Sequence, residues 1–220
     1  MYQNKRAAFY TLGCKLNFSE TSTISRQLKN KGFVITDFDR VADLYVINTC
    51  SVTENANKNC RRIIRKAKEK SPNALIIVTG CYAQLKPKEI TQIEGVDMVL
   101  GANDKFNIPN LLNNLNKKNK AEIHGCEIEN LEYNSAYSLN DRTRSFLKIQ
   151  DGCNYTCSYC TIPFARGKNR SDSIENIVAN AKKIVNQGIK EIVITGVNIG
   201  TYDNQNKTFT NLIKELDKVK

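Results

Sequence analysis

The stretch "SFLKIQDGCNYTCSYCTIPFARG", residues 145–167, decides how the fold of this chain is interpreted. It opens with an apolar run typical of a strand and continues into a loop that holds Cys153, Cys157 and Cys160. Three thiolates on one short loop suit a compact metal centre. A structural zinc site needs a fourth cysteine or histidine, and none follows Cys160. The spacing therefore predicts a four-iron cluster with one iron left open for a further ligand.

Composition narrows the class of protein. The chain has 220 residues, a net charge of +11 and eight cysteines, with 40% hydrophobic residues. Its longest apolar run, "ALIIV" at 74–78, is far shorter than the roughly 20 residues that cross a bilayer, and the start of the chain lacks a secretory pattern. We therefore expect a cytoplasmic protein without membrane contact, whose cysteines bind metal or react rather than form disulfides. The positive charge favours an anionic partner such as nucleic acid.

The first ~115 residues alternate between short apolar runs and helical patterns, which predicts βαβ units and a parallel sheet. The basic helix among them, "KNCRRIIRKAKEK" at 58–70, is either a solvated face or an RNA-facing one. The expected strands are 8–12, 44–48, 74–79 and 98–100, and the expected helices are 20–29, 55–70, 87–93 and 108–117.

A polar, asparagine-rich passage then separates a second unit. In it we expect strands at 145–149 and 191–195, and helices at 172–187 and 208–219. Ser171 or Asp172 suits the N-cap of the first of these helices. Two parallel strands and two helices do not cover a sheet, so we expect an incomplete domain in an N-terminal fragment of a longer protein.

A second set of cysteines is dispersed along the sequence. Cys14, Cys50 and Cys81 each follow one of the first three expected strands and precede a helical segment. The carboxyl ends of parallel strands meet at one edge of a sheet, and a helix N-terminus favours the thiolate. These three cysteines are therefore predicted to converge, although any one alone is more typical of a small buried residue.

The loop with Tyr159 before its last cysteine, placed between a strand and a helix, resembles that of radical S-adenosylmethionine (SAM) enzymes. With the second cysteine set, the whole chain resembles the radical SAM methylthiotransferases. Their branch acting on N6-threonylcarbamoyladenosine at tRNA position 37 is the most similar. The motifs that carry the likeness are "TLGCKLNFSE", "NTCSVTENA", "VTGCYAQ", "VLGANDK", "CTIPFARG" and "ITGVNIGTY".

The resemblance implies an α/β fold, with an N-terminal parallel-sheet methylthiotransferase domain at 1–126, a linker at 127–141 and a truncated radical SAM (β/α) barrel at 142–220. It implies two 4Fe-4S clusters: an auxiliary one on Cys14, Cys50 and Cys81, and one on the loop cysteines that binds S-adenosylmethionine. Cleavage of that cofactor yields a radical, and a methylthio group is delivered to C2 of the adenine. The implied partners are tRNA and a reductant such as flavodoxin or ferredoxin.

Further site residues are assigned with alternatives. Tyr159 and Ile162 are candidate cofactor contacts or ordinary loop residues. Gly196 and Asn198 end the second strand of the unit, where this superfamily often binds the amino group of the cofactor. For Arg166 and Arg170 the partner is the cofactor carboxylate or RNA phosphate, or else each is a solvated arginine.

Four residues are left outside the predicted site. Asn17 lies one helical turn beyond Cys14, and a helix cap is its ordinary role. Cys60 and Cys126 are expected to be free thiols, and His124 a surface or packing residue.

Three functions remain open on the sequence. The first is a tRNA methylthiotransferase, a transferase whose 220-residue fragment is expected to be inactive alone. The second is a methylthiotransferase for isopentenyladenosine or a ribosomal protein. The third is a non-catalytic iron–sulfur or zinc module that binds RNA.

Overall fold

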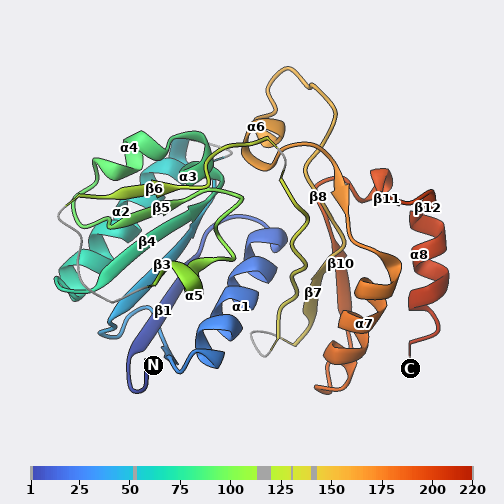
Figure 1. Cartoon of the computed structure of the whole chain (residues 1–220), viewed down its shortest axis with the longest axis horizontal. Coiled ribbons are helices and arrows are strands. Elements are labelled where there is room, and N and C mark those ends of the chain that lie inside the picture. Colours follow the sequence, from blue (N-terminus) through green and yellow to red (C-terminus); the bar gives the residue numbers. More distant parts are fainter. Residues whose placement is uncertain (1, 52–53, 113–119, 130, 140–142, 220) are drawn as a thin grey trace.

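The computed structural model describes residues 2–51, 54–112, 120–129, 131–139 and 143–219. It is an α/β structure in which a six-stranded parallel sheet stands beside a smaller unit built on a pair of parallel strands (Figure 1). The predicted fold class is therefore confirmed. No helix in the described ranges is long and apolar enough to span a membrane.

The large sheet is parallel throughout, in the order β2-β1-β3-β4-β5-β6. Its centre is apolar because β3 and β4 are covered on both faces. The strands are β1 (Arg6–Thr11), β2 (Val34–Thr36), β3 (Leu44–Thr49), β4 (Leu75–Gly80), β5 (Met98–Leu100) and β6 (Glu122–His124).

Side chains alternate between the two faces of this sheet, so each face has a core of its own. On one face Ile76 and Val78 pack with α2 (Glu54–Lys70), α3 (Cys81–Leu85) and α4 (Pro87–Thr91). On the other face Leu75 and Ile77 pack with α1 (Lys15–Asn30) and α5 (Ile108–Leu111). The expected helix at 108–117 begins at Ile108 as predicted, but α5 ends at Leu111 and Leu112 is its C-cap; residues 113–117 of that prediction lie outside the described part.

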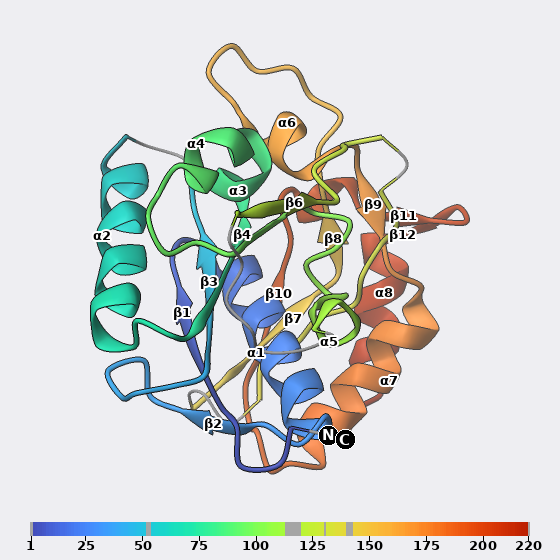
Figure 2. The same ribbon diagram turned by 60° about the vertical axis from the view of Figure 1, so that its left-hand side comes forward.

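Helix α1 lies between the large sheet and the second unit (Figures 1 and 2). Ile24 and Leu28 belong to the core of the large sheet. From its opposite face Phe18 meets the ring of Phe146 edge-on, with centroids 5.7 Å apart. A helix covered on both sides buries its polar residues too, and α1 begins at Lys15, five residues before the expected start at 20.

The second unit pairs β7 (Ser145–Lys148) with β10 (Ile192–Thr195) in parallel and packs α7 (Ile174–Val185) and α8 (Phe209–Leu216) on them. The predicted N-cap of α7 is wrong by one or two positions. Ser173 is the cap, and its Oγ accepts a hydrogen bond from the Asn176 amide, because Ser171 is still paired in a strand.

Short elements connect this unit to the cysteine loop. They are β8 (Gln150–Asp151), α6 (Ile162–Arg166), β9 (Arg170–Ser171), the 3-10 turn η1 (Ile199–Thr201), β11 (Asp203–Asn204) and β12 (Lys207–Thr208). β8 pairs with β9 in antiparallel fashion, so the loop between them, which holds three cysteines, starts and ends at neighbouring strands. The expected helices and strands of the second unit are all present, with ends that differ by at most three residues.

Candidate iron–sulfur and cofactor site

Cys14, Cys50 and Cys81 lie just beyond the ends of β1, β3 and β4, which are neighbours in the sheet. The register continues to these ends, because Thr49 pairs with Gly80. A Cβ added at Gly13 would lie 2.9 Å from the Cys50 sulfur, so the turn before Cys14 packs directly against Cys50. The structure therefore brings the three dispersed cysteines to one edge of the sheet, as the sequence predicts.

Gly80 makes this close approach possible. Its φ of +95° is in the region that favours glycine, and a Cβ there would lie 2.3 Å from the carbonyl oxygen of Thr49. A side chain at this position would separate the ends of β3 and β4. The glycine before Cys81 thus holds Cys81 next to Cys50.

Asn17 ties the same turns together from inside α1. Its amide nitrogen donates to the carbonyl oxygens of Leu12 at 2.8 Å and Thr49 at 2.9 Å. The side chain is fully buried. Asn17 is therefore not a helix cap, since Cys14 occupies the N-cap position, and its role is to fix the Cys14 turn against the Cys50 turn.

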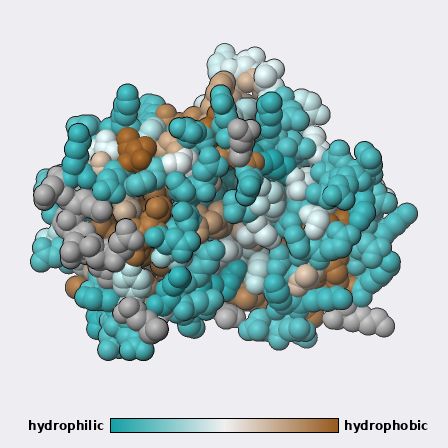
Figure 3. Space-filling view, viewed as in Figure 1, coloured by the Kyte–Doolittle hydropathy of each residue, from teal (hydrophilic) through white to brown (hydrophobic). Residues whose placement is uncertain are grey.

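The loop of Cys153, Cys157 and Cys160 projects from the top of the molecule in Figures 1 and 3. Its ends are pinned, because the Cys153 amide donates to the Gly167 carbonyl oxygen at 3.0 Å. Inside the loop the Tyr155 amide donates to the Cys153 sulfur at 3.5 Å. Cys157 is exposed and the other two cysteines are half-buried. A pinned loop with accessible sulfurs and an N–H to sulfur bond suits a cluster ligand set.

Gln150 is a site residue that the sequence analysis missed. Its fully buried side chain donates to the Gly152 carbonyl oxygen at 2.6 Å and accepts from the Asn198 amide at 2.9 Å. A Cβ at Gly196 would lie 2.8 Å from the same Gln150 oxygen. One glutamine thus holds Gly196 and Asn198 beside the start of the cysteine loop. In the sequence, the one signal for Gln150 is its position between the end of β7 and the cysteine loop.

Aromatic residues surround this loop. Tyr159 is fully exposed, and its cofactor contact stays a prediction, as does that of the half-buried Ile162. Phe164 is 70% exposed. It lines an open groove of about 930 Å³ that includes Cys153 and Arg170. Exposed rings next to a cysteine loop give a surface on which a flat base can stack.

The two cysteine sets lie at the same end of the molecule because α6 packs against α3 (Figures 1 and 2). Helix α3 starts at Cys81, and α6 starts two residues after Cys160. Ala165 and Arg166 of α6 line a small pocket together with Cys81. The contact between these helices is the structural link between the two predicted clusters.

A network of five buried charged side chains lies under this contact. We call it the buried ion network. Glu20 is its centre, and one of its carboxylate oxygens accepts from three cations: Lys105 at 2.7 Å, Arg166 at 3.0 Å and Lys148 at 3.2 Å. Asp151 completes it, at 2.8 Å from Lys148 and 3.0 Å from Arg166. Burial alone raises the pKa of Glu20, but the three cations outweigh it and hold this pKa well below its ordinary value.

Arg166 does not have the accessible position expected of a residue that binds RNA phosphate or a cofactor carboxylate. Its guanidinium is buried and bonds to Glu20, Asp151 and the side-chain oxygen of Asn17. Burial lowers the pKa of an arginine, yet the two carboxylates raise that of Arg166 overall. The expectation that Arg166 binds the cofactor carboxylate or RNA phosphate, or is solvated, is therefore corrected: its partners are buried side chains of the protein. Arg170 is half-buried and donates to the carbonyl oxygens of Arg166 and Lys168.

The charges of the buried ion network suit an anionic group on the first cysteine set. Three buried cations face two carboxylates, and the half-buried Arg170 adds a further cation at 3.8 Å from Asp151, so positive charge is in excess. Lys105 and Arg166 line the pocket at Cys81. Burial raises the pKa of the Cys81 thiol, and these two cations oppose that rise. The cations offset burial only in part, so the pKa of Cys81 stays raised; the excess positive charge of the network nevertheless favours an anionic iron–sulfur group bound at this pocket, because an uncompensated buried charge is costly.

Cys60 and Cys126 stay outside both sets. Burial raises the pKa of Cys60 to about 12 and that of Cys126 to about 11, which are values of inert thiols. His124 ends β6 and bonds to Glu122 at 3.2 Å. Within the described ranges, no three His, Cys, Asp or Glu side chains are arranged to hold a single metal ion.

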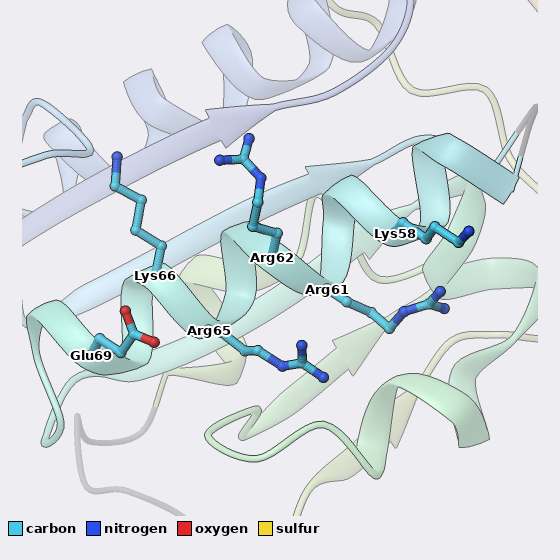
Figure 4. Close-up of a pocket in the computed structure, with 6 residues that line it drawn as sticks. All are labelled: Lys58, Arg61, Arg62, Arg65, Lys66 and Glu69. Carbon is cyan, nitrogen blue, oxygen red and sulfur yellow. The ribbon is translucent and has the colours of Figure 1, made fainter.

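Helix α2 presents a basic face with two rows of side chains (Figure 4). Lys58, Arg61 and Arg65 extend to one side of the helix, and Arg62 and Lys66 to the other. Arg61 is paired with Glu89 at 2.8 Å and Lys66 with Asp39 at 2.6 Å. This face is solvated and keeps a strong positive charge, which suits contact with phosphate groups.

Comparison with protein families finds two matches along the chain. Residues 6–101 match UPF0004, described as an uncharacterized protein family, and residues 147–219 match the radical SAM superfamily. The cysteine loop falls in the second match, and the three dispersed cysteines fall in the first.

Curated proteins match over nearly the whole chain. The threonylcarbamoyladenosine tRNA methylthiotransferase of Bacillus subtilis is 42% identical over 96% of this chain and 48% of its own length. That of Thermotoga maritima is 39% identical over 98% of this chain and 49% of its own. A tRNA-2-methylthio-N(6)-dimethylallyladenosine synthase of Clostridium botulinum is 35% identical over 95% and 49%. The chain spans about half the length of the curated relatives it matches.

Among solved structures, a radical S-adenosylmethionine methyltransferase from Kitasatospora setae, bound to cobalamin and a [4Fe-4S] cluster, superposes with a TM-score of 0.62. The two proteins share 13% sequence identity, and the match covers 97% of this chain and 52% of the methyltransferase chain, so the likeness concerns the fold. The resemblance drawn from the cysteine motifs is confirmed: the chain holds a region that matches UPF0004 followed by one that matches the radical SAM superfamily, and it is similar to tRNA methylthiotransferases over almost all of its length.

Proposed function

We propose that this chain is the cluster-binding and cofactor-binding part of a radical SAM tRNA methylthiotransferase. One observation carries the proposal: the packing of α3 on α6 directs a cysteine set from each unit to the same end of the molecule. An enzyme that joins a radical step to sulfur transfer needs two metal centres near one substrate, and this arrangement supplies the ligands for both.

The ligand sets follow from the donor chemistry. Cys14, Cys50 and Cys81 would hold an auxiliary 4Fe-4S cluster next to the buried ion network, and the loop cysteines would hold the cluster that binds S-adenosylmethionine. When bound, these groups supply the one-electron chemistry that an unactivated C–H bond requires. The protein orients them: Asn17 and Gly80 fix the first set, and Gln150 fixes the loop beside Gly196 and Asn198.

For the substrate we propose N6-threonylcarbamoyladenosine at tRNA position 37, methylthiolated at C2 of the adenine. The support is the higher identity to relatives named for that nucleoside than to those named for the dimethylallyl one. A methylthiotransferase for isopentenyladenosine or for a ribosomal protein is the alternative within the enzyme class. The basic face of α2 is the surface that we assign to tRNA, and a flavodoxin or ferredoxin would supply electrons.

Iron analysis tests the cofactor part of the proposal. Anaerobic reconstitution with iron and sulfide is expected to give about eight iron atoms per chain. Replacing Cys14, Cys50 and Cys81 by alanine lowers this to about four, as does the same change at the loop cysteines. Cys60→Ala and Cys126→Ala are the matched controls and keep the full amount. Zinc in place of iron, or unchanged iron in the triple variants, would support the alternative of a non-catalytic metal module.

Nucleoside analysis tests the substrate. The gene of the whole protein is deleted, and tRNA nucleosides are compared by mass spectrometry with those of the parent strain. The proposal expects loss of the methylthio form of N6-threonylcarbamoyladenosine and its return on complementation. Loss of the methylthio form of the isopentenyl nucleoside instead would contradict the proposed substrate while leaving the enzyme class intact.

A further inference from the structure

Arg166 and Asn17 connect the two cysteine sets through side chains alone. Arg166 lies six residues after Cys160 and Asn17 three residues after Cys14. The Arg166 Nη2 atom donates to the side-chain oxygen of Asn17. The side-chain nitrogen of Asn17 in turn donates to the carbonyl oxygens of Leu12 and Thr49, which precede Cys14 and Cys50. A single hydrogen bond between two side chains therefore joins α6, which follows Cys160, to α1, which follows Cys14.

The remaining bonds of Arg166 fix its direction. Its Nη1 atom lies 3.0 Å from a Glu20 oxygen on α1 and 3.0 Å from an Asp151 oxygen on β8. A guanidinium is a rigid planar fork, so its three acceptors, two on α1 and one on β8, determine its position and its plane. The side chain is 4% exposed, and Glu20 is fully buried, so water does not compete for these bonds.

The network crosses between the two units at two of its three bonds to Glu20, those of Lys148 and Arg166, whereas Lys105 bonds to Glu20 within the first unit. Glu20 belongs to the UPF0004 region, whereas Lys148 and Arg166 belong to the radical SAM region. Apolar contacts at the same interface, such as Phe18 with Phe146, are less directional than these bonds. The ionic bonds therefore set the register of the interface, and the apolar contacts allow small displacements of it.

We propose that Arg166 is a positioning residue that holds the two cysteine sets, and the clusters they bind, at a fixed separation and orientation. This inference rests on the proposed function, because it concerns two clusters in one chain. Arg166 acts through Asn17 on the Cys14 turn and through α6 on the Cys160 loop. Arg166 also lines the pocket at Cys81, so its charge faces the first cysteine set as well.

The test measures the magnetic interaction between the clusters. The reconstituted protein is reduced so that both clusters are paramagnetic, and the mutual broadening of their electron paramagnetic resonance signals is recorded. We expect Arg166→Met to keep about eight iron atoms and to lose most of the broadening. Arg144→Met is the matched control: its exposed ion pair with Glu191 is on the same unit, and the broadening should stay at the parent level.

A conservative variant covers a failure of Arg166→Met to fold or to load iron. Arg166→Lys keeps the charge and loses the fork, so we expect full iron content with reduced broadening. Parent-level broadening in whichever of the two variants loads both clusters would overturn the inference and leave the proposed function standing. Failure of both variants to load iron would show a general folding role and overturn it as well. About four iron atoms in the parent protein would overturn the proposed function itself.

Discussion

Glu20→Gln gives the sharpest energetic test of the buried ion network. The substitution keeps the shape of the side chain and removes the charge that Lys105, Lys148 and Arg166 share. Asp151 is then the one carboxylate left in the network to face these three cations. Removing one partner of a buried ion pair costs about 3–5 kcal/mol, so we expect the free energy of unfolding to fall by about that amount.

The effect has a definite pH dependence. The cations around Glu20 hold its pKa well below the ordinary value, despite the burial that raises it. A carboxyl group with a lowered pKa stabilises the folded state fully above its unfolded pKa of about 4.3, and loses this contribution as the pH falls toward the folded pKa. The difference between the parent and Glu20→Gln is therefore largest at neutral pH and shrinks in acid. Asp151, lowered in the same way, leaves a smaller acid dependence in the variant.

Urea denaturation followed by far-ultraviolet circular dichroism measures both effects. It is carried out at neutral pH and again below the ordinary pKa of a glutamate. Glu191→Gln is the control, because this carboxylate is 60% exposed in its pair with Arg144 and should change stability by about 0.2–1 kcal/mol at most. Equal stability of the two variants at neutral pH, or a Glu20→Gln effect that does not shrink in acid, would refute the reasoning.

Three further changes have expected outcomes. Gly80→Ala should lower iron loading and the midpoint of unfolding. Gly188→Ala is its control: Gly188 also has a positive φ, of +80°, but has open space around it, so the iron content should stay unchanged. Equal iron loading in the two variants would contradict the role of close packing at Gly80. Ser173→Ala removes the cap of α7 and should cost about 1 kcal/mol in urea denaturation, and no loss would contradict the cap. Lys105→Met removes a buried positive charge near Cys81, so redox titration should show a more negative potential of the auxiliary cluster; an unchanged potential would contradict the electrostatic role.

The parts of the structure that the sequence predicts are those with a strong local pattern. β3 and β4 are continuous apolar runs, and the structure buries nearly all of their residues. The placement of Cys14, Cys50 and Cys81 at one edge follows from parallel strands alone, since Cys50 and Cys81 come next after a strand and Cys14 follows the end of β1 by three residues. The sequence does not predict bounds for the short edge strands β2 and β6, because three residues carry too little periodicity.

The contacts between the units are the part that local pattern does not reveal. Glu20 and Lys148 are 128 residues apart, and each alone is typical of a solvated surface charge. A helix with one apolar stripe, like that of Ile24 and Leu28 on α1, predicts a solvated opposite face. That face is buried here because a second sheet covers it, and this follows only from the tertiary arrangement.

The interface between the two units is held by buried ions rather than by apolar side chains alone, and this choice has a physical reason. Replacing buried ion pairs by well-packed apolar side chains is often neutral or stabilising, so stability alone does not account for the five charged groups of the network. Directional bonds have another consequence: a guanidinium bonded to Glu20, Asp151 and Asn17 permits one register between α1 and α6, whereas apolar side chains tolerate several. Since each of these helices follows a cysteine of the proposed site, one register of the helices means one relative position of the cysteines. Under the proposed function, the ionic interface supplies the precision that two neighbouring metal centres would require.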